Sequence, residues 1–188
     1  MTAADTNEAD SQPNEPTARM LTWARNSTLY RLSRQMLTEK QLSDAIRRKA
    51  KEKFNPIAAP TLQALADYAV AFAYEQNALD DNNYASVSAR SAVRNGKSRR
   101  MIAQKLATKG VAAETVETAM IETNDLVAAV IFARKRRFGP YRTVELDDKR
   151  KLKELSAFAR NGFSFEIGKK VFDMDHDEAN DVLLNTPT

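Results

Sequence analysis

Residues 99–111 read RRMIAQKLATKGV, a basic segment whose apolar residues recur at helical spacing and which ends at a Lys-Gly pair. Residues 151–163, KLKELSAFARNGF, repeat the same order of bases, spaced apolar residues, one glycine and one apolar residue. A glycine after such a segment is typical of a helix C-terminus, because glycine adopts the left-handed conformation without a steric penalty. The two stretches therefore predict that Gly110 and Gly162 end helices with positive φ, and that the apolar residue after each packs back on its helix.

The rest of the 188-residue chain has the same helical character. Glycine and proline number only five and six, and no segment shows the sustained period-two alternation of a strand. The lack of cysteine excludes disulfides and thiolate metal sites. The sequence therefore predicts an all-α protein.

The expected helices fall into three groups, and the middle helix of each ends at the basic-glycine-apolar pattern or at a relic of it. The apolar anchors are Phe54, Val111 and Phe163, which lie 57 and 52 residues apart, and the first group lacks the glycine. A group this small buries little core alone, so the pattern predicts three tandem three-helix repeats stacked in an elongated array. The expected boundaries are a disordered acidic tail at 1–18, a first repeat at 19–79, a second at 80–123, and a third with an acidic end at 124–188.

Polar residues before the apolar segments predict where helices begin. The expected N-caps are Thr38 (in a capping box with Gln41), Ser98, Asp147 or Asp148, and Ser164. The side chains expected to face inward include Trp23, Leu29, Met36, Leu42, Ile46, Ile102, Leu106, Val116, Met120, Val130, Leu152, Phe158, Ala159, Phe165 and Val171. Arg137 is expected on the apolar face of a helix that Gly139-Pro140 ends, with its stem packed and its charge exposed.

The net charge of +4 hides a segregation of charge along the chain. Residues 1–18 hold four acids and residues 173–188 hold five, with no base in either segment, so the 29 bases face only 16 acids in between. A body with a net charge of +13 favours a polyanionic or acidic partner. No apolar run is long enough to cross a membrane, and the acidic N-terminus is unlike a secretory signal, so we expect a cytoplasmic protein.

Three basic clusters are candidate binding surfaces. Residues 82–113 hold seven bases and no acid, and therefore forgo the internal ion pairs of about 0.2–0.5 kcal/mol each that solvated helices usually form. The alternative is a solvated face whose acidic partners lie on other helices. Four consecutive bases at 134–137 point in all directions on a helix, so at most two or three share one surface. The third cluster begins at Lys149 and Arg150 and is diluted by neighbouring acids. The candidate partner- or DNA-binding residues are Arg90, Arg94, Lys97, Arg99, Arg100, Lys105, Arg134, Lys135, Arg136, Lys149 and Arg150.

Two sets of motifs in order carry a family resemblance: LDD…YA…R…R.GKS.R.I...L..KGV from Leu79 to Val111, and L..FA.RNGFSFE...KV from Leu155 to Val171. Together they resemble RecX, the bacterial family of regulators of the RecA recombinase. The resemblance implies three tandem three-helix units in a curved all-α body, without catalytic activity or cofactor. It also implies a monomer that binds the RecA–DNA filament along its groove and restrains RecA's ATPase, strand exchange and co-protease activity in DNA repair, recombination and the SOS response. The acidic tail, the acidic end and the first repeat without its glycine depart from the family pattern.

Other interpretations of the same residues remain open. A general nucleic-acid-binding helical protein that acts without RecA would explain the basic clusters, although few aromatic residues accompany them for base stacking. A helix-turn-helix interpretation lacks a helix that concentrates base-reading side chains, and a nuclear-localisation interpretation of RKRR conflicts with the bacterial resemblance. The acidic segment Asp173 to Glu178 lacks the glycine and glutamate positions of a calcium loop, so a helix cap is expected there.

Overall fold

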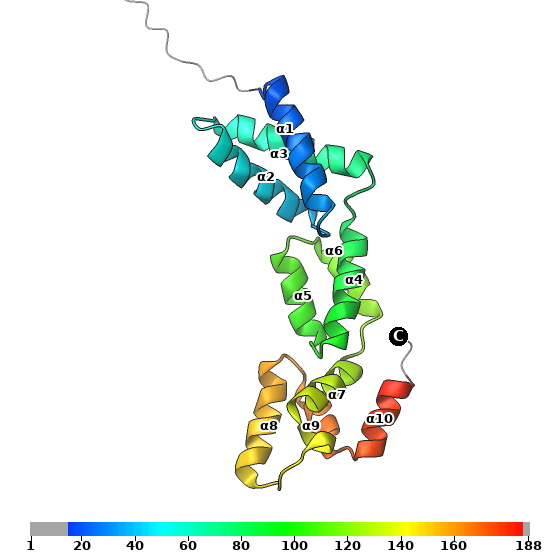
Figure 1. The fold of residues 1–188 in the computed structure, drawn as a ribbon. Helices are drawn as coiled ribbons and strands as arrows, with labels where there is room; N and C mark the ends of the chain where they lie inside the picture. The colour runs from blue at the N-terminus through cyan, green and yellow to red at the C-terminus, as the bar shows by residue number, and fades with distance from the viewer. Residues whose placement is uncertain (1–14, 186–188) are drawn as a thin grey trace, which may run out of the picture. The chain divides into compact units, whose positions relative to one another are not determined.

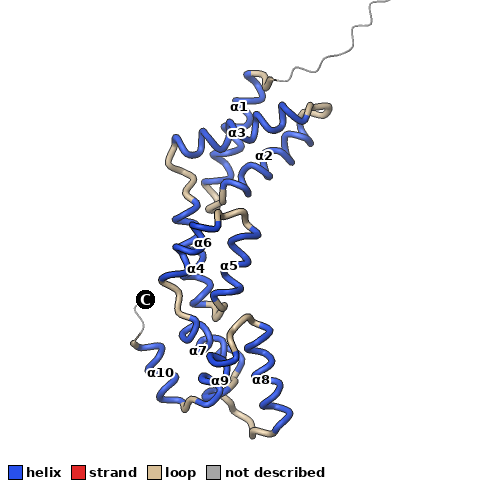
Figure 2. The backbone as a smooth tube through the Cα atoms, turned by 180° about the vertical axis from the view of Figure 1, so that it is seen from behind, coloured by secondary structure: helices blue, strands red, loops and turns tan. Residues whose placement is uncertain are grey.

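The computed structural model describes residues 15–185, and within that range it contains helices and no strand (Figures 1 and 2). The prediction of an all-α protein is therefore confirmed. The chain divides into two compact units, an N-terminal unit up to Asp80 and a C-terminal unit from Asp81 onward. The acidic tail predicted at 1–18 lies mostly outside the described residues, and the first helix begins at its C-terminal end, at Ala18.

The N-terminal unit packs three helices around one apolar cluster: α1 (Ala18–Leu32), α2 (Glu39–Lys53) and α3 (Ala59–Glu75). The predicted capping box is present, because the Thr38 side chain accepts from the Gln41 N–H and the Gln41 side chain accepts from the Thr38 N–H. The apolar stripe of α2 that begins at Leu42 and Ile46 is fully buried, as its spacing predicted.

The buried face of α1 differs from the predicted one. Leu29 and Met36 are 45% and 46% exposed, whereas the polar Thr28 is fully buried. The Thr28 hydroxyl is satisfied by donating to the Ala24 carbonyl at 2.9 Å, so a polar residue can occupy the buried stripe. Small side chains on this face let α1 approach its neighbours closely, while Trp23 lies half-buried at the edge of the stripe.

The C-terminal unit holds the remaining helices of the described chain and two apolar clusters. The first cluster lies among α4 (Asp81–Arg94), α5 (Arg99–Thr108) and α6 (Ala113–Ile121), and the predicted core residues Val116 and Met120 are buried in it. The second cluster lies among α7 (Asp125–Arg136), the 3-10 turn η1 (Gly139–Tyr141), α8 (Asp148–Arg160), α9 (Phe165–Asp173) and α10 (His176–Leu184). The exact number of repeats and their elongated, curved arrangement stay predictions.

Both glycine stops behave as predicted. Gly110 and Gly162 have φ of +85° and +81°. In each case the glycine N–H and the next N–H donate back into the last turn, as in Val111 to the Leu106 carbonyl at 3.2 Å and Phe163 to the Phe158 carbonyl at 3.2 Å. Val111 and Phe163 are buried, so each turn is closed by the apolar contact that accompanies this type of cap.

The end of α7 corrects the prediction for Arg137. That residue is exposed and left-handed at φ +55°, and it ends the helix itself, so its side chain does not lie on the apolar face. The helix therefore stops before Gly139, which instead opens η1 in a buried position. A side-chain Cβ at Gly139 would lie 2.8 Å from the Val171 carbonyl oxygen, so the close approach to α9 requires glycine there.

The last helices follow their predicted caps but not their predicted faces. Asp147 and Ser164 cap α8 and α9, and Asp175 caps α10 in the acidic segment, as expected. Leu152 and Phe165 are each 70% exposed and Ala159 is exposed, so their inward assignment was wrong. Phe158 is buried, as predicted, and shares the buried stripe of α8 with Ala157 and Glu154. The Glu154 carboxylate can lie in the interior because it forms a buried ion pair.

Candidate partner interface

The turn between α4 and α5 is held against α7 by a glycine. Gly96 is buried with φ +71°, and a Cβ at that position would lie 2.9 Å from the Phe132 backbone nitrogen. Ser98 caps α5 as predicted, because its side chain accepts from the Met101 N–H. The turn is therefore fixed by close backbone packing, and the charged residues on either side of it are positioned by neutral contacts.

Two of the predicted basic clusters meet at this turn. The Lys135 ammonium of α7 lies 3.0 Å from Asn95 Oδ1 and 3.4 Å from the Arg94 carbonyl oxygen, so α7 brings its charge to the C-terminal end of α4. We call the resulting surface the basic corner, defined by Arg94, Lys97, Arg99, Arg100, Lys135 and Arg136. All six side chains are exposed, and within residues 15–185 none of them forms an ion pair with an acid.

The consecutive bases of α7 diverge, as their spacing predicted. The Arg136 guanidinium lies 6.0 Å from the centre of the Phe132 ring, one turn along the helix from the contact with Gly96. Burial raises the pKa of the Tyr141 phenol, and the charge of Arg134 lowers it by a smaller amount. Lys135 and Arg136 therefore belong to the basic corner, whereas the charge of Arg134 acts on Tyr141 of η1.

The end of α8 adds a contact that the sequence did not reveal. The Ser98 hydroxyl donates to the Asn161 carbonyl at 2.7 Å, and a Cβ at Gly162 would lie only 2.6 Å from that hydroxyl. The exposed Arg160 directly precedes this contact, so its backbone lies beside the basic corner. Its charge belongs to no run of bases, so the pattern of charges along the chain did not indicate it.

One acid also reaches the basic corner. Asp125, in the first turn of α7, accepts from the backbone N–H of Arg99 at 2.6 Å. Its carboxylate thereby satisfies one of the free N–H groups at the start of α5. The Arg99 side chain remains exposed, so the acid stabilises the helix start without covering the surface.

The other predicted site residues lie at greater distances from the turn. Arg90 is one helical turn before Arg94 on the same exposed face of α4, and Lys105 is exposed near the end of α5. Lys149 lies at the start of α8, about 18 Å along that helix from Asn161. Arg150 is half-buried with its Nε 4.0 Å from the Glu154 carboxylate, which gives it a structural contact. The third basic cluster is thus separate from the basic corner.

Two other kinds of feature, a metal-binding cluster and a membrane-spanning helix, are absent from the described residues. Between residues 15 and 185, no group of three or more His, Asp or Glu side chains is arranged to hold a metal ion. None of the helices described is long and apolar enough to span a bilayer.

Comparison with known proteins agrees with the motifs. Residues 80–120 match the family model for the second three-helix domain of RecX. A protein of Agrobacterium fabrum named regulatory protein RecX is 62% identical over 180 residues, which cover 96% of this chain and 98% of that protein. Another regulatory protein RecX, from Myxococcus xanthus, is 37% identical over 168 residues, or 86% of this chain and 90% of that protein.

A solved structure described as a crystal structure of regulatory protein RecX matches the fold with a TM-score of 0.63. It is 24% identical, and the match covers 82% of this chain and 72% of that one. These relatives are named as regulatory proteins and not as enzymes. Because two relatives above 30% identity extend over most of the chain, the protein belongs to the RecX family of regulatory proteins.

Proposed function

We propose that this protein binds the RecA–DNA filament through the basic corner and restrains the ATPase, strand exchange and co-protease activities of RecA. The observation that carries the proposal is a set of exposed cations, from α4, α5 and α7, that flank one turn and form no ion pair with an acid in the described chain. A surface of one charge attracts a polyanion from a distance and increases its association rate. Phosphate contacts of this kind are largely indifferent to sequence, as a filament regulator requires.

The test is a double charge reversal, Arg99→Glu with Arg100→Glu. Both side chains are exposed, so the melting temperature should stay unchanged while cosedimentation with RecA filaments weakens and loses part of its salt dependence. The matched control is Lys153→Glu with Lys170→Glu, an equal charge change on exposed residues of α8 and α9 away from the basic corner. This control should bind as the wild type does.

Binding to naked DNA distinguishes contacts with phosphates from contacts with acidic RecA side chains. If the basic corner contacts phosphates, the double reversal weakens naked DNA and filaments in parallel; if it contacts acidic RecA side chains, only filament binding falls. A folded double variant that restrains RecA ATPase at the wild-type concentration would remove the basic corner from the interface. Equal binding of wild type to naked DNA and to filaments, with no effect on RecA ATPase, would favour a general nucleic-acid-binding protein instead.

A further inference from the structure

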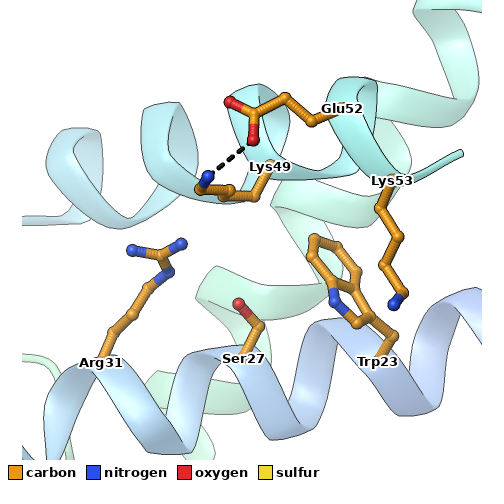
Figure 3. A pocket seen from close by; sticks show the side chains of 6 residues that line it. All are labelled: Trp23, Ser27, Arg31, Lys49, Glu52 and Lys53. Atoms are coloured by element: carbon orange, nitrogen blue, oxygen red, sulfur yellow. Dashed lines mark hydrogen bonds and ion pairs between the residues drawn. The ribbon is translucent and has the colours of Figure 1, made fainter. Parts of the chain in front are cut away.

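A cavity of about 350 Å³ lies between α1 and α2 in the N-terminal unit. It is lined by Trp23, Ser27, Arg31, Lys49, Glu52 and Lys53. In Figure 3, the α1 side chains point toward α2, with Trp23 opposite Lys53 and Arg31 opposite Lys49. Three cations, one carboxylate and one indole thus share a single groove, of a size at the lower end of small-molecule sites.

The only carboxylate in this lining is already engaged. Glu52 accepts from the Lys49 ammonium at 2.6 Å. The hydrogen bond from Lys49, with the charges of Lys49 and Arg48, holds the pKa of Glu52 below its usual value, so the carboxylate stays ionised and paired. Arg31 and Lys53 form no ion pair within residues 15–185, and two positive charges in the groove therefore lack a counter-charge.

Arg31 also has a hydrogen-bond donor that the described residues do not satisfy. Its Nε atom is buried and has no hydrogen-bond partner in the described part of the chain. A cation near a helix C-terminus gains from the helix dipole without a ligand, but that interaction leaves a buried N–H unsatisfied, which is costly. The Arg31 side chain also lines the groove, and a guanidinium is suited to an oxyanion, which Arg binds through two parallel hydrogen bonds.

Trp23 adds an aromatic wall to the charges. Its indole is half-buried and held edge-to-face against Phe54, with ring centres 5.2 Å apart. Along α1 it precedes Arg31 by eight residues, or about 12 Å. An aromatic platform beside cations is the arrangement by which proteins bind single-stranded nucleic acid, with a base against the ring and phosphates at the charges.

The wider charge of this segment agrees with a polyanionic ligand. Residues 19–53 hold ten bases and three acids. Two of those acids, Asp44 and Glu52, are already paired with lysines on α2. We propose that the α1–α2 groove binds single-stranded nucleic acid, with a base against Trp23 and phosphates at Arg31 and Lys53.

Trp23 is the only tryptophan of the chain, so its fluorescence reports on this groove alone. Titration of the full-length protein with a short oligothymidylate, without RecA, should quench that emission in a saturable, salt-dependent manner. Oligouridylate of the same length should behave alike, because the contacts are to phosphate and base face. Since no recombinase is present, a failure here is distinct from a failure of the basic corner on filaments.

Two variants test the residues, and a third is the control. Arg31→Gln and Lys53→Gln should each weaken oligonucleotide binding and reduce its salt slope by about 0.7, the contribution of one contact to single-stranded phosphate. Lys53 is exposed, so its variant stays informative if Arg31→Gln fails to fold. Arg19→Gln removes an exposed charge from α1 outside the groove and should bind as the wild type does.

Three results would overturn the proposal. The first is an unchanged emission at oligothymidylate concentrations that saturate the protein in a labelled-oligonucleotide anisotropy assay. The second is equal affinity for a duplex of the same length, which would remove the base contact. The third is the same quenching by polyglutamate at equal charge concentration, which would make the groove a site for acidic peptides.

Discussion

The buried carboxylate of Glu154 should be the most sensitive single position of the C-terminal unit. The side chain is fully buried and accepts from the Gly139 N–H at 2.9 Å and from Arg142 at 3.0 Å and 2.7 Å. Arg142 in turn lies over the Phe172 ring at 4.9 Å. The Glu154 carboxylate therefore connects η1 and the following loop to α8, and the Arg142 guanidinium that it binds packs on α9.

Replacement by an apolar residue, Glu154→Leu, leaves Arg142 without its counter-charge. Loss of one partner of a buried pair costs about 3–5 kcal/mol, mostly because the other charge stays buried and unpaired. The Arg142 side chain keeps 15% of its exposure and can partly rehydrate, so we expect the lower end, about 3 kcal/mol. For a unit of this size, that corresponds to a fall of the melting temperature on the order of 10 °C.

The assay is urea and thermal unfolding of the full chain, followed by far-UV circular dichroism. The double variant Glu154→Leu with Arg142→Met removes both charges and should recover the part of the loss that comes from the unpaired Arg142, since an apolar pair replaces a buried ion pair at little cost. The Gly139 N–H loses its acceptor in both variants, so that part of the loss remains. The control Asp173→Asn breaks the exposed pair with Lys169 on α9 and should change stability by less than about 1 kcal/mol. A single Glu154→Leu variant as stable as the wild type would refute the reasoning.

Two further predictions concern the helix ends. Gly162→Ala should destabilise the C-terminal unit by more than the roughly 1 kcal/mol of a left-handed alanine, because its Cβ would also lie 2.6 Å from the Ser98 hydroxyl; an unchanged unfolding midpoint would contradict this contact. Removal of residues 1–14 should leave the melting temperature unaltered. Removal of residues 1–17 should cost about 1 kcal/mol, because it takes away Thr17, whose side chain accepts from the Met20 N–H; equal stability of the two truncations would show that this cap is dispensable.

Local features of the fold were predictable because they depend on neighbouring residues. The Thr38 capping box and the Gly110 stop need only a few consecutive positions, and both are present. The choice of helix face is not local, since a helix with apolar residues on two sides offers two possible stripes. Leu29 and Leu152 lie on the stripe that the fold leaves exposed.

The interior of α8 was beyond sequence reasoning for a further reason. Glu154 is buried because Arg142 comes from a loop 12 residues earlier and Gly139 donates from η1. Nothing in the sequence of α8 indicates that Arg142 will pair with Glu154, and the apolar periodicity of a helix predicts a carboxylate to be exposed. The same limit applies to the basic corner, where Lys135 meets Asn95 across 40 residues of chain.

The α1–α2 groove was predictable in part. The excess of bases between residues 19 and 53 is visible in the sequence, but three acids lie among them, whereas residues 82–113 hold no acid. The spacing of Trp23, Ser27 and Arg31 at every fourth residue also places them on one face of a helix. What the sequence lacks is the antiparallel approach of α2, which turns that face into the wall of a cavity.

The basic corner owes its geometry to contacts that the side chains of Arg99 and Arg100 do not make, and this determines how its function can be tested. Gly96 lies against the Phe132 backbone, Ser98 donates to the Asn161 carbonyl, and Lys135 reaches Asn95. The exposed guanidinium groups of Arg99 and Arg100 contribute to none of these contacts except through their backbones. Charge at this surface can therefore be reversed without loss of the scaffold that positions it. A fall in filament binding by the Arg99→Glu, Arg100→Glu variant, at unchanged melting temperature, would then measure the charge of the surface itself.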